Sequence, residues 1–146
     1  MREIKFRAWH KEKHKMFGVQ KMSFKTGKIL PYGWNMEHDG VEFELMQYTG
    51  LKDKNGKEVF EGDIVKEQNM LSVCIFLDDI GAYAFIPIEL YKQNRNDLYL
   101  YSNFHLVYNL FEEYGTDCFF DNDVPHKYVE VIGNIFQNPE LLEVGE

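Results

Sequence analysis

The stretch Gln47–Val65, which reads QYTGLKDKNGKEVFEGDIV, holds the strongest fold signals of the chain. Asn55-Gly56 separates two strand-like segments, and because both residue types tolerate positive φ angles, the pair predicts a β-hairpin with a type I′ turn. Glycine adopts positive φ without strain, and Asp side chains accept hydrogen bonds from nearby backbone N–H groups. We therefore interpret five residues of this stretch as structural turn residues and not as a ligand site: Gly50, Asn55, Gly56, Gly62 and Asp63.

Strand patterns extend from this stretch in both directions. Toward the N-terminus, apolar residues alternate with other residues twice, at Ile4, Phe6 and Ala8 and again at Val41, Phe43 and Leu45. A period of two is typical of a half-buried strand. Toward the C-terminus, we expect strands at residues 58–66, 71–77, 82–88 and 127–132, which are rich in β-branched and aromatic residues.

Two helices are expected in the second half of the chain. Aromatic and apolar residues recur at three- and four-residue steps over residues 103–114, the pattern of an amphipathic helix. Near the C-terminus, Asn138-Pro139-Glu140 predicts a short helix with Asn138 as its N-cap and Pro139 as its first residue. The fold class is therefore mainly β (β-rich α+β), with antiparallel sheets, one amphipathic helix and a short C-terminal helix.

Composition points to a folded chain inside the cell. The 146 residues are 45% hydrophobic and 16% aromatic, which argues against disorder. No apolar run reaches the ~18–20 residues that span a bilayer, and the N-terminus lacks the apolar block of a signal peptide. We therefore expect a cytoplasmic protein without membrane contact. Cys74 and Cys118 lie in apolar stretches, so we expect buried thiols and no disulfide framework.

Charge is distributed unevenly along the chain. Residues 1–30 contain nine Lys/Arg and two Asp/Glu, whereas the rest contains seven Lys/Arg and 22 Asp/Glu. Either the basic end folds against the acidic body or pairs with another copy, or it faces nucleic acid. We favour the first interpretation, because the net charge of −8 repels phosphate at long range. Nucleic-acid contact would use Arg2, Lys5, Arg7, Lys11, Lys13 and Lys15.

Four pieces of the sequence, in this order and spacing, resemble the YopX family of phage and prophage proteins. They are Phe6-Arg7-Ala8-Trp9, the central stretch Gln47–Val65, Val131-Ile132-Gly133-Asn134 and Asn138–Leu142. The resemblance implies a β-rich fold with an SH3-like barrel in its later part and an origin in a bacterial host. It implies no established activity and no catalytic residue.

With this resemblance, the chain divides into two regions of one compact unit. Residues 1–48 are expected to form an N-terminal β region with the basic end. Residues 49–146 are expected to form the SH3-like barrel region, with an inserted segment at 97–126 that holds many aromatic residues, six acidic residues and no Lys or Arg.

Arg7 and Trp9 are the most ambiguous residues of the N-terminal strand. They lie on the face of the strand that the alternation predicts to be polar. Packing of the fold alone seldom requires both an arginine and a tryptophan on such a face. They can form a cation–π pair within the chain. They can equally anchor an interface with another molecule, because Trp and Arg are enriched at the centres of interfaces.

Signatures of catalysis and of cofactor binding are weak throughout the sequence. No serine lies in a Gly-x-Ser-x-Gly elbow, and neither common phosphate-binding glycine motif occurs. His10 and His14 are four residues apart, but three lysines in the same segment oppose a cation. We therefore expect no catalytic residue, no cofactor and no metal.

These observations favour a non-catalytic protein-binding or structural module that self-associates and that binds a phage or host protein. The alternative is a nucleic-acid-binding accessory protein that uses the basic N-terminal segment.

Overall fold

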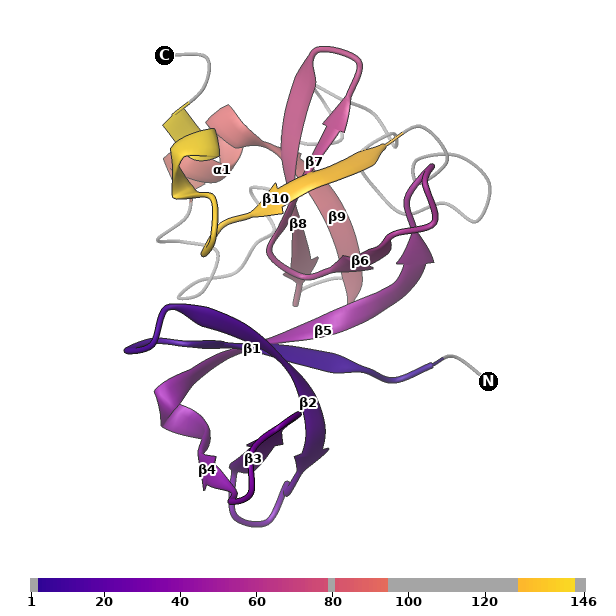
Figure 1. The fold of residues 1–146 in the computed structure, drawn as a ribbon. Helices are drawn as coiled ribbons and strands as arrows, with labels where there is room; N and C mark the ends of the chain where they lie inside the picture. Colours follow the sequence, from indigo (N-terminus) through magenta and orange to yellow (C-terminus); the bar gives the residue numbers. More distant parts are fainter. Residues whose placement is uncertain (1–2, 79–80, 95–128, 144–146) are drawn as a thin grey trace.

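The computed structural model describes residues 3–78, 81–94 and 129–143, which form two antiparallel sheets (Figure 1). Strands make up most of this part of the chain, which confirms the mainly β class. The predicted helix at 103–114, the aromatic-acidic segment at 97–126 and Cys118 lie outside the described residues. None of the described helices is long and apolar enough to cross a membrane.

The first sheet contains six strands in the order β4-β3-β2-β1-β5-β6. Their bounds are Phe6–His10 (β1), Lys15–Met22 (β2), Lys28–Pro31 (β3), His38–Asp39 (β4), Phe43–Lys52 (β5) and Glu58–Phe60 (β6). β1 lies between β2 and β5, so that Ala8 is paired with Phe17 on one side and with Leu45 on the other. Strand β5 runs through the expected boundary between residues 48 and 49.

The second sheet contains four strands in the order β10-β7-β8-β9. Their bounds are Asp63–Glu67 (β7), Met70–Leu77 (β8), Ala82–Pro87 (β9) and Glu130–Asn134 (β10). Helix α1 (Ile88–Asn94) follows β9, and the 3₁₀ helix η2 (Pro139–Glu143) follows β10. The sequence predicted strands in all four places.

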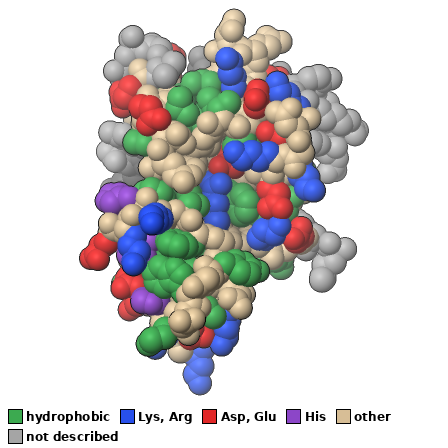
Figure 2. Space-filling view, in the orientation of Figure 1, with side chains coloured by type: hydrophobic (Ala, Val, Ile, Leu, Met, Phe, Trp, Pro, Cys, Tyr) green, Lys and Arg blue, Asp and Glu red, His purple; other side chains and the backbone are tan. Residues whose placement is uncertain are grey.

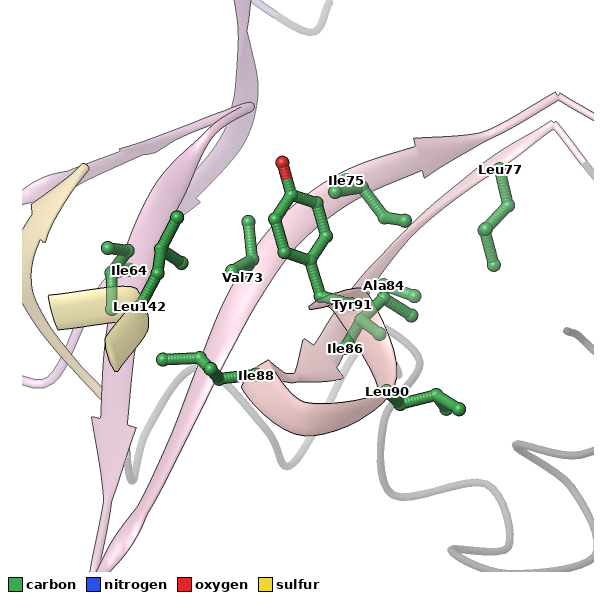
Figure 3. Close-up of a cluster of buried hydrophobic side chains, with 10 residues drawn as sticks. All are labelled: Ile64, Val73, Ile75, Leu77, Ala84, Ile86, Ile88, Leu90, Tyr91 and Leu142. Carbon is green, nitrogen blue, oxygen red and sulfur yellow. The ribbon is translucent and has the colours of Figure 1, made fainter. Parts of the chain in front are cut away.

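Strands β8 and β9 are buried on both faces, which explains their continuous apolar sequences. One face packs with α1 and η2 into the larger core cluster (Figure 3), which contains Ile64, Val73, Ile75, Leu77, Ala84, Ile86, Ile88, Leu90, Tyr91 and Leu142. The other face contributes to a second cluster of Val59, Val65, Cys74, Tyr83, Phe85, Val129 and Val131. Successive residues such as Val73 and Cys74 therefore belong to different clusters.

The start of α1 was predicted as strand and is helical. The expected strand extended to Ile88, but the chain leaves the sheet after Pro87. Ile88 and Tyr91 are three residues apart, lie on the same side of a helix and both join the larger cluster. A helix of seven residues repeats its pattern too few times for the sequence to reveal it.

The strand predicted from Val41 begins two residues later than expected. Val41 lies in the 3₁₀ helix η1 (Gly40–Glu42) and is 72% exposed, whereas Phe43 is buried. The carboxylate of Asp39 accepts a hydrogen bond from the Val41 N–H at 3.1 Å and thereby caps this turn. The cap removes residues 40–42 from the sheet.

The Asn55-Gly56 hairpin is present, but its predicted type I′ turn is wrong. Type I′ requires positive φ at both residues. Gly56 has a φ of 83°, whereas the non-glycine residues with positive φ in the described chain are His14 and Gln68. Oδ1 of Asp53 accepts hydrogen bonds from the N–H groups of both Asn55 and Lys57, and these bonds hold the loop in another geometry.

The C-terminal helix begins at Pro139 as predicted, but it is a 3₁₀ helix. Oδ1 of Asn138 accepts a hydrogen bond from the Asn134 N–H at 3.2 Å, so it bonds back to β10 and not forward as the predicted N-cap. A Cβ at Gly133 would lie 2.5 Å from this oxygen, which explains the need for glycine there.

Candidate functional site

Arg7 lies between the two sheets. Its Nη2 is 2.6 Å from Oδ1 of Asp63 and donates a 3.4 Å hydrogen bond to the carbonyl of Glu61. Its guanidinium carbon is 4.7 Å from the ring centroid of Phe60, within the range of a cation–π contact. The Arg7 side chain is 15% exposed and that of Asp63 is 1% exposed. These contacts join β1 of the first sheet to the start of β7.

Trp9 occupies the same space between the sheets. Its ring stacks on Phe136, with centroids 5.9 Å apart and planes at 19°, and His14 packs edge-on against it. Nearby, the Sδ atom of Met46 lies close to Gly62. A Cβ atom added at Gly62 would be 3.4 Å from this sulfur. Both residues pack within the chain, but not as the expected cation–π pair with each other: Arg7 lies over Phe60 and Trp9 stacks on Phe136.

The carboxyl groups of Asp63 and Glu61 both have raised pKa values. Burial raises the pKa of Asp63, and Arg7 and the Phe60 N–H offset part of that rise. Burial also raises the pKa of Glu61, and the charge of Asp78 raises it further. The inter-sheet cluster, which we define as Arg7, Phe60, Glu61 and Asp63, therefore holds charge in a largely desolvated place.

This cluster offers little to a substrate. Asp63 is fully buried by Arg7 and its own turn, and its Oδ2 accepts a 2.8 Å hydrogen bond from the Phe60 N–H. Cys74 is also buried, and burial raises the pKa of its thiol well above the ordinary value, which keeps it protonated and unreactive. Within the described ranges, no three His, Cys, Asp or Glu residues meet in a way that could hold a metal ion.

The basic residues in and beside β1 are paired with acidic residues from later in the chain. Nζ of Lys5 is 2.6 Å from Oε1 of Glu58, and Nζ of Lys11 is 3.4 Å from Oε1 of Glu44. With the Arg7 pair, three of the six residues considered for nucleic-acid contact form such bonds. Part of the basic end is thus paired with acidic residues from later in the chain, as the first of the two interpretations of the charge pattern expects.

The other residues of that set are placed differently. Nζ of Lys13 lies 5.3 Å from the ring centroid of Trp34. Lys15 is exposed and forms no ion pair with any described residue. Arg2 is outside the described residues.

A second candidate site is formed by the segments that connect β2, β3, β4 and β5. These segments carry four exposed large apolar side chains, which we call the distal surface: Phe24, Tyr32, Met36 and Val41. Phe24 is 90% exposed, the highest fraction among the large apolar residues of the described chain. The Gly40 N–H donates to the Gly27 carbonyl at 3.0 Å, which holds the turn of Phe24 beside the segment of Val41.

Both lysines and acidic residues, among them Glu37 and Asp39, lie around this distal surface. Lys25 follows Phe24 in the β2–β3 turn, and Lys28 begins β3 opposite Asp39. Neither forms an ion pair within the described ranges, whereas Lys21 on β2 is 2.8 Å from Oε1 of Glu37. Figure 2 shows hydrophobic and Lys/Arg side chains next to one another at this end of the molecule. Sequence reasoning missed the surface, because exposed apolar residues in loops have no periodicity.

Asp53 is a structural residue that the turn analysis overlooked. Its Oδ1 accepts from the N–H groups of Asn55 and Lys57, and its Oδ2 accepts from the Val131 N–H at 2.9 Å. Burial acts to raise the pKa of Asp53, but these three hydrogen bonds outweigh it, so the pKa lies below its ordinary value. The Asp-Lys-Asn-Gly spacing could have signalled the first two bonds. The third joins residues 78 positions apart.

Gly50, Gly56 and Gly62 adopt φ angles of 89°, 83° and 85°. Gly50 lies where the register between β5 and β6 shifts, so it allows a bulge. Gly62 lies in the turn from β6 to β7. Its N–H donates a hydrogen bond to the Cys74 carbonyl, and its own carbonyl accepts one from the Ile135 N–H. Gly62 therefore joins the turn after β6 to strand β8 and to the segment after β10.

Comparison with known proteins identifies a family and a related fold. The crystal structure of protein EF1440 from Enterococcus faecalis is similar to this chain, with a TM-score of 0.59, 24% sequence identity, and coverage of 97% of this chain and 99% of that chain. At this identity the likeness concerns the fold alone. No protein with a curated function matches. The family described as YopX protein matches residues 5–143, so the chain belongs to the YopX family.

Proposed function

We propose that this chain is a non-catalytic protein-binding or structural module that self-associates. The observation that carries the proposal is the distal surface, where Phe24 is 90%, Val41 and Met36 are 72%, and Tyr32 is 65% exposed. Large apolar side chains that stay exposed to water are unfavourable, and exposed apolar patches are typical of interaction sites. Aromatic residues and Met are also enriched in interface cores.

The contacts between the two sheets support the same proposal indirectly. Arg7 and Trp9 are largely buried inside the chain, which leaves them little surface for a partner. The partner surface is therefore assigned to the connections beyond β2, at the end of the first sheet that lies away from the second sheet (Figure 1).

The proposal includes an SH3-like barrel in the later part of the chain and a phage or prophage protein that works in the bacterial cytoplasm. Support for the barrel comes from the bonds that join the β5–β6 hairpin to β10. Asp53 accepts from the Val131 N–H, and the Lys54 N–H donates to the Val129 carbonyl at 3.0 Å. Support for the origin comes from the family alone.

Light scattering on a size-exclusion column tests the proposal with the purified chain. We expect the mean mass of the wild type to rise with concentration across the micromolar range, and Phe24→Ser/Tyr32→Ser to remain monomeric. Met70→Ser is the matched control, because Met70 is 44% exposed but lies on the second sheet. A wild type that stays monomeric at all concentrations would remove self-association.

The second candidate function is nucleic-acid binding, favoured by Lys13 over the ring of Trp34 and by Lys15, which is exposed without an ion pair among the described residues. Stacking on aromatic rings within a positive surface is the usual mode of single-strand binding. The test is retention of single-stranded DNA at ~50 mM salt, with loss on adding salt. Lys13→Ala/Lys15→Ala is a better variant than a change at Arg7, because Arg7 is buried in its ion pair. Absence of retention would exclude this candidate.

A further inference from the structure

The connection between β3 and β4 carries two residues of the distal surface and, between them, one residue that packs inward. Tyr32 and Met36 are 65% and 72% exposed. Trp34 packs against the core cluster of the first sheet, and its ring centroid lies 5.2 Å from that of Phe17 and 6.0 Å from that of Phe43. Trp34 therefore anchors this connection to β2 and β5.

His10 is a buried ionisable residue beside this anchor. It is 5% exposed, and its ring centroid lies 5.8 Å from that of Trp34 and 5.0 Å from that of Phe43. Its Nδ1 accepts a hydrogen bond from the Lys13 N–H at 3.0 Å. Because a backbone N–H can only donate, this Nδ1 carries no proton, and protonation of Nδ1 would break the bond. The same turn places Nζ of Lys13 5.3 Å from the ring centroid of Trp34.

We propose that His10 is a pH-sensitive anchor of the distal surface. Protonation of its ring releases the Lys13 N–H and loosens the packing of Trp34. Tyr32 and Met36, which flank Trp34 in the sequence, then lose their fixed positions, and self-association weakens. The inference rests on the proposed function, because it assigns a pH regulation to the same surface. Two physical costs oppose a protonated ring in the closed arrangement, namely the lost hydrogen bond and the desolvation of a buried cation.

The charged and titratable side chains around His10 do not offset these costs. They are Lys11, Glu12, Lys13 and His14 of the β1–β2 turn, Lys15 of β2, His38 of β4, Glu42 of η1 and Glu44 of β5. Lys15 is paired with His10 in the strand register, so the nearest charge across the ladder is a cation. Glu44 is 3.4 Å from Nζ of Lys11, and Glu42 is 3.2 Å from Nδ1 of His38. Among the described residues, neither carboxylate forms an ion pair with His10.

A second histidine contacts the same tryptophan. The ring centroids of His38 and Trp34 are 4.5 Å apart, and the side chain of His38 is 38% exposed. Protonation of His38 would give it a charge opposite to that of its neighbour Glu42, so acid acting at His38 tightens β4 against η1. The two histidines therefore predict opposite effects of acid on this part of the chain, and an experiment can separate them.

Hydrogen exchange of the Lys13 N–H in the full chain measures the anchor directly. If the closed turn excludes the second ring proton, an open turn gains it below the ordinary histidine pKa of about 6.5. The protection factor of this N–H should then fall about tenfold between about pH 7.5 and pH 5.5. His10→Asn keeps an oxygen that can accept the Lys13 N–H and does not titrate, so its protection should change by less than about twofold.

Two control variants keep the test decisive even where His10→Asn does not fold. His14→Asn removes an exposed histidine of the same turn, and Asn tolerates the φ of 51° at this position. His38→Gln removes the histidine that contacts Trp34 from the other side. Both variants should keep the wild-type fall in protection, because His10 is intact in each.

Light scattering then tests the link to the distal surface. At a fixed micromolar concentration, the mean mass of wild type should fall toward that of the monomer when the pH is lowered over the same range. His10→Asn should keep its mean mass, and His14→Asn and His38→Gln should behave as wild type does.

Each other outcome has a definite meaning. If the wild-type protection factor changes by less than about twofold, or if His38→Gln abolishes the change, the inference is overturned. It is also overturned if protection falls while the mean mass stays constant, because the anchor then does not regulate the surface. If wild type is monomeric at both pH values, the proposed self-association is wrong, whereas a fall in protection that requires His10 would still support the pH-sensitive anchor.

Discussion

Replacement of Asp53 by Ala should destabilise the protein more than its position in a hairpin turn suggests. The carboxylate accepts three backbone hydrogen bonds, at 2.8 Å from Asn55, 2.9 Å from Lys57 and 2.9 Å from Val131. The first two donors are partly buried and water can replace the carboxylate, so each contributes about 0.5–1 kcal/mol. The Val131 N–H is buried, and leaving it unpaired costs about 1–3 kcal/mol. The expected loss in unfolding free energy is therefore ~3 kcal/mol.

Two further variants isolate the parts of this effect. Asp53→Asn keeps one carbonyl oxygen for the turn but presents an N–H₂ group to the Val131 N–H, so we expect a loss of about 2 kcal/mol. Asp39→Ala removes a single cap bond to the Val41 N–H at an exposed place and should cost about 1 kcal/mol or less. Urea unfolding followed by tryptophan fluorescence measures all three variants at constant m-value.

The pH dependence gives an independent check of the same bonds. Burial raises the pKa of Asp53, but the three N–H groups lower it by more, so the folded-state pKa lies below the unfolded value. The stabilisation by the carboxylate is then complete above the unfolded pKa, about 3.9, and is lost as pH falls through the lower folded-state pKa. The stability gap between wild type and Asp53→Asn should shrink accordingly. A loss in Asp53→Ala no larger than in Asp39→Ala, or a gap that does not change with pH, would refute the reasoning.

Three other variants test the contacts between the sheets, all by urea unfolding. Arg7→Met should cost about 3–5 kcal/mol, because it leaves the buried carboxyl of Asp63 without its partner, and a cost under 1 kcal/mol would contradict a buried pair. Gly62→Ala should cost about 1–2 kcal/mol from its φ of 85°, and Gly56→Ala with a φ of 83° should cost a similar amount; no loss in either would contradict the positive φ. Burial and the charge of Asp78 raise the pKa of Glu61 above its unfolded value, so wild-type stability should fall as pH rises through that pKa, and Glu61→Gln should remove this part of the fall; an identical pH profile for the two proteins would contradict it.

Local sequence signals predicted the strands well where burial is continuous or turn chemistry is strong. Strands β8 and β9 were recognisable because their apolar runs serve two core clusters at once. Gly56 and Gly62 were recognisable because few other residues adopt their φ angles. The type I′ turn was wrong because Asp53, two residues earlier, imposes another hydrogen-bond pattern.

Contacts between distant residues were not accessible in the same way. The alternation near the N-terminus marked Lys5, Arg7 and Trp9 as a polar face, and in a lone strand such a face is exposed to water. In the folded chain Arg7 meets Asp63, which is 56 residues away, and Trp9 meets Phe136. The sequence pattern of one segment does not predict its contacts with the other. The burial of this face therefore follows only from the way in which the two sheets pack.

This use of charge inside the chain bears directly on where partners can bind. Arg7 is held by Asp63, and Lys5 and Lys11 form ion pairs with later residues, so a new partner at β1 would have to displace existing acids. Lys25 and Lys28 have no such pairs among the described residues, and they lie beside the most exposed apolar side chain there, Phe24. The basic N-terminal part of the sequence therefore contributes to two different places in the structure, one at β1 and one at the β2–β3 turn. β1 joins the two sheets, whereas Lys25 and Lys28 form no ion pair among the described residues.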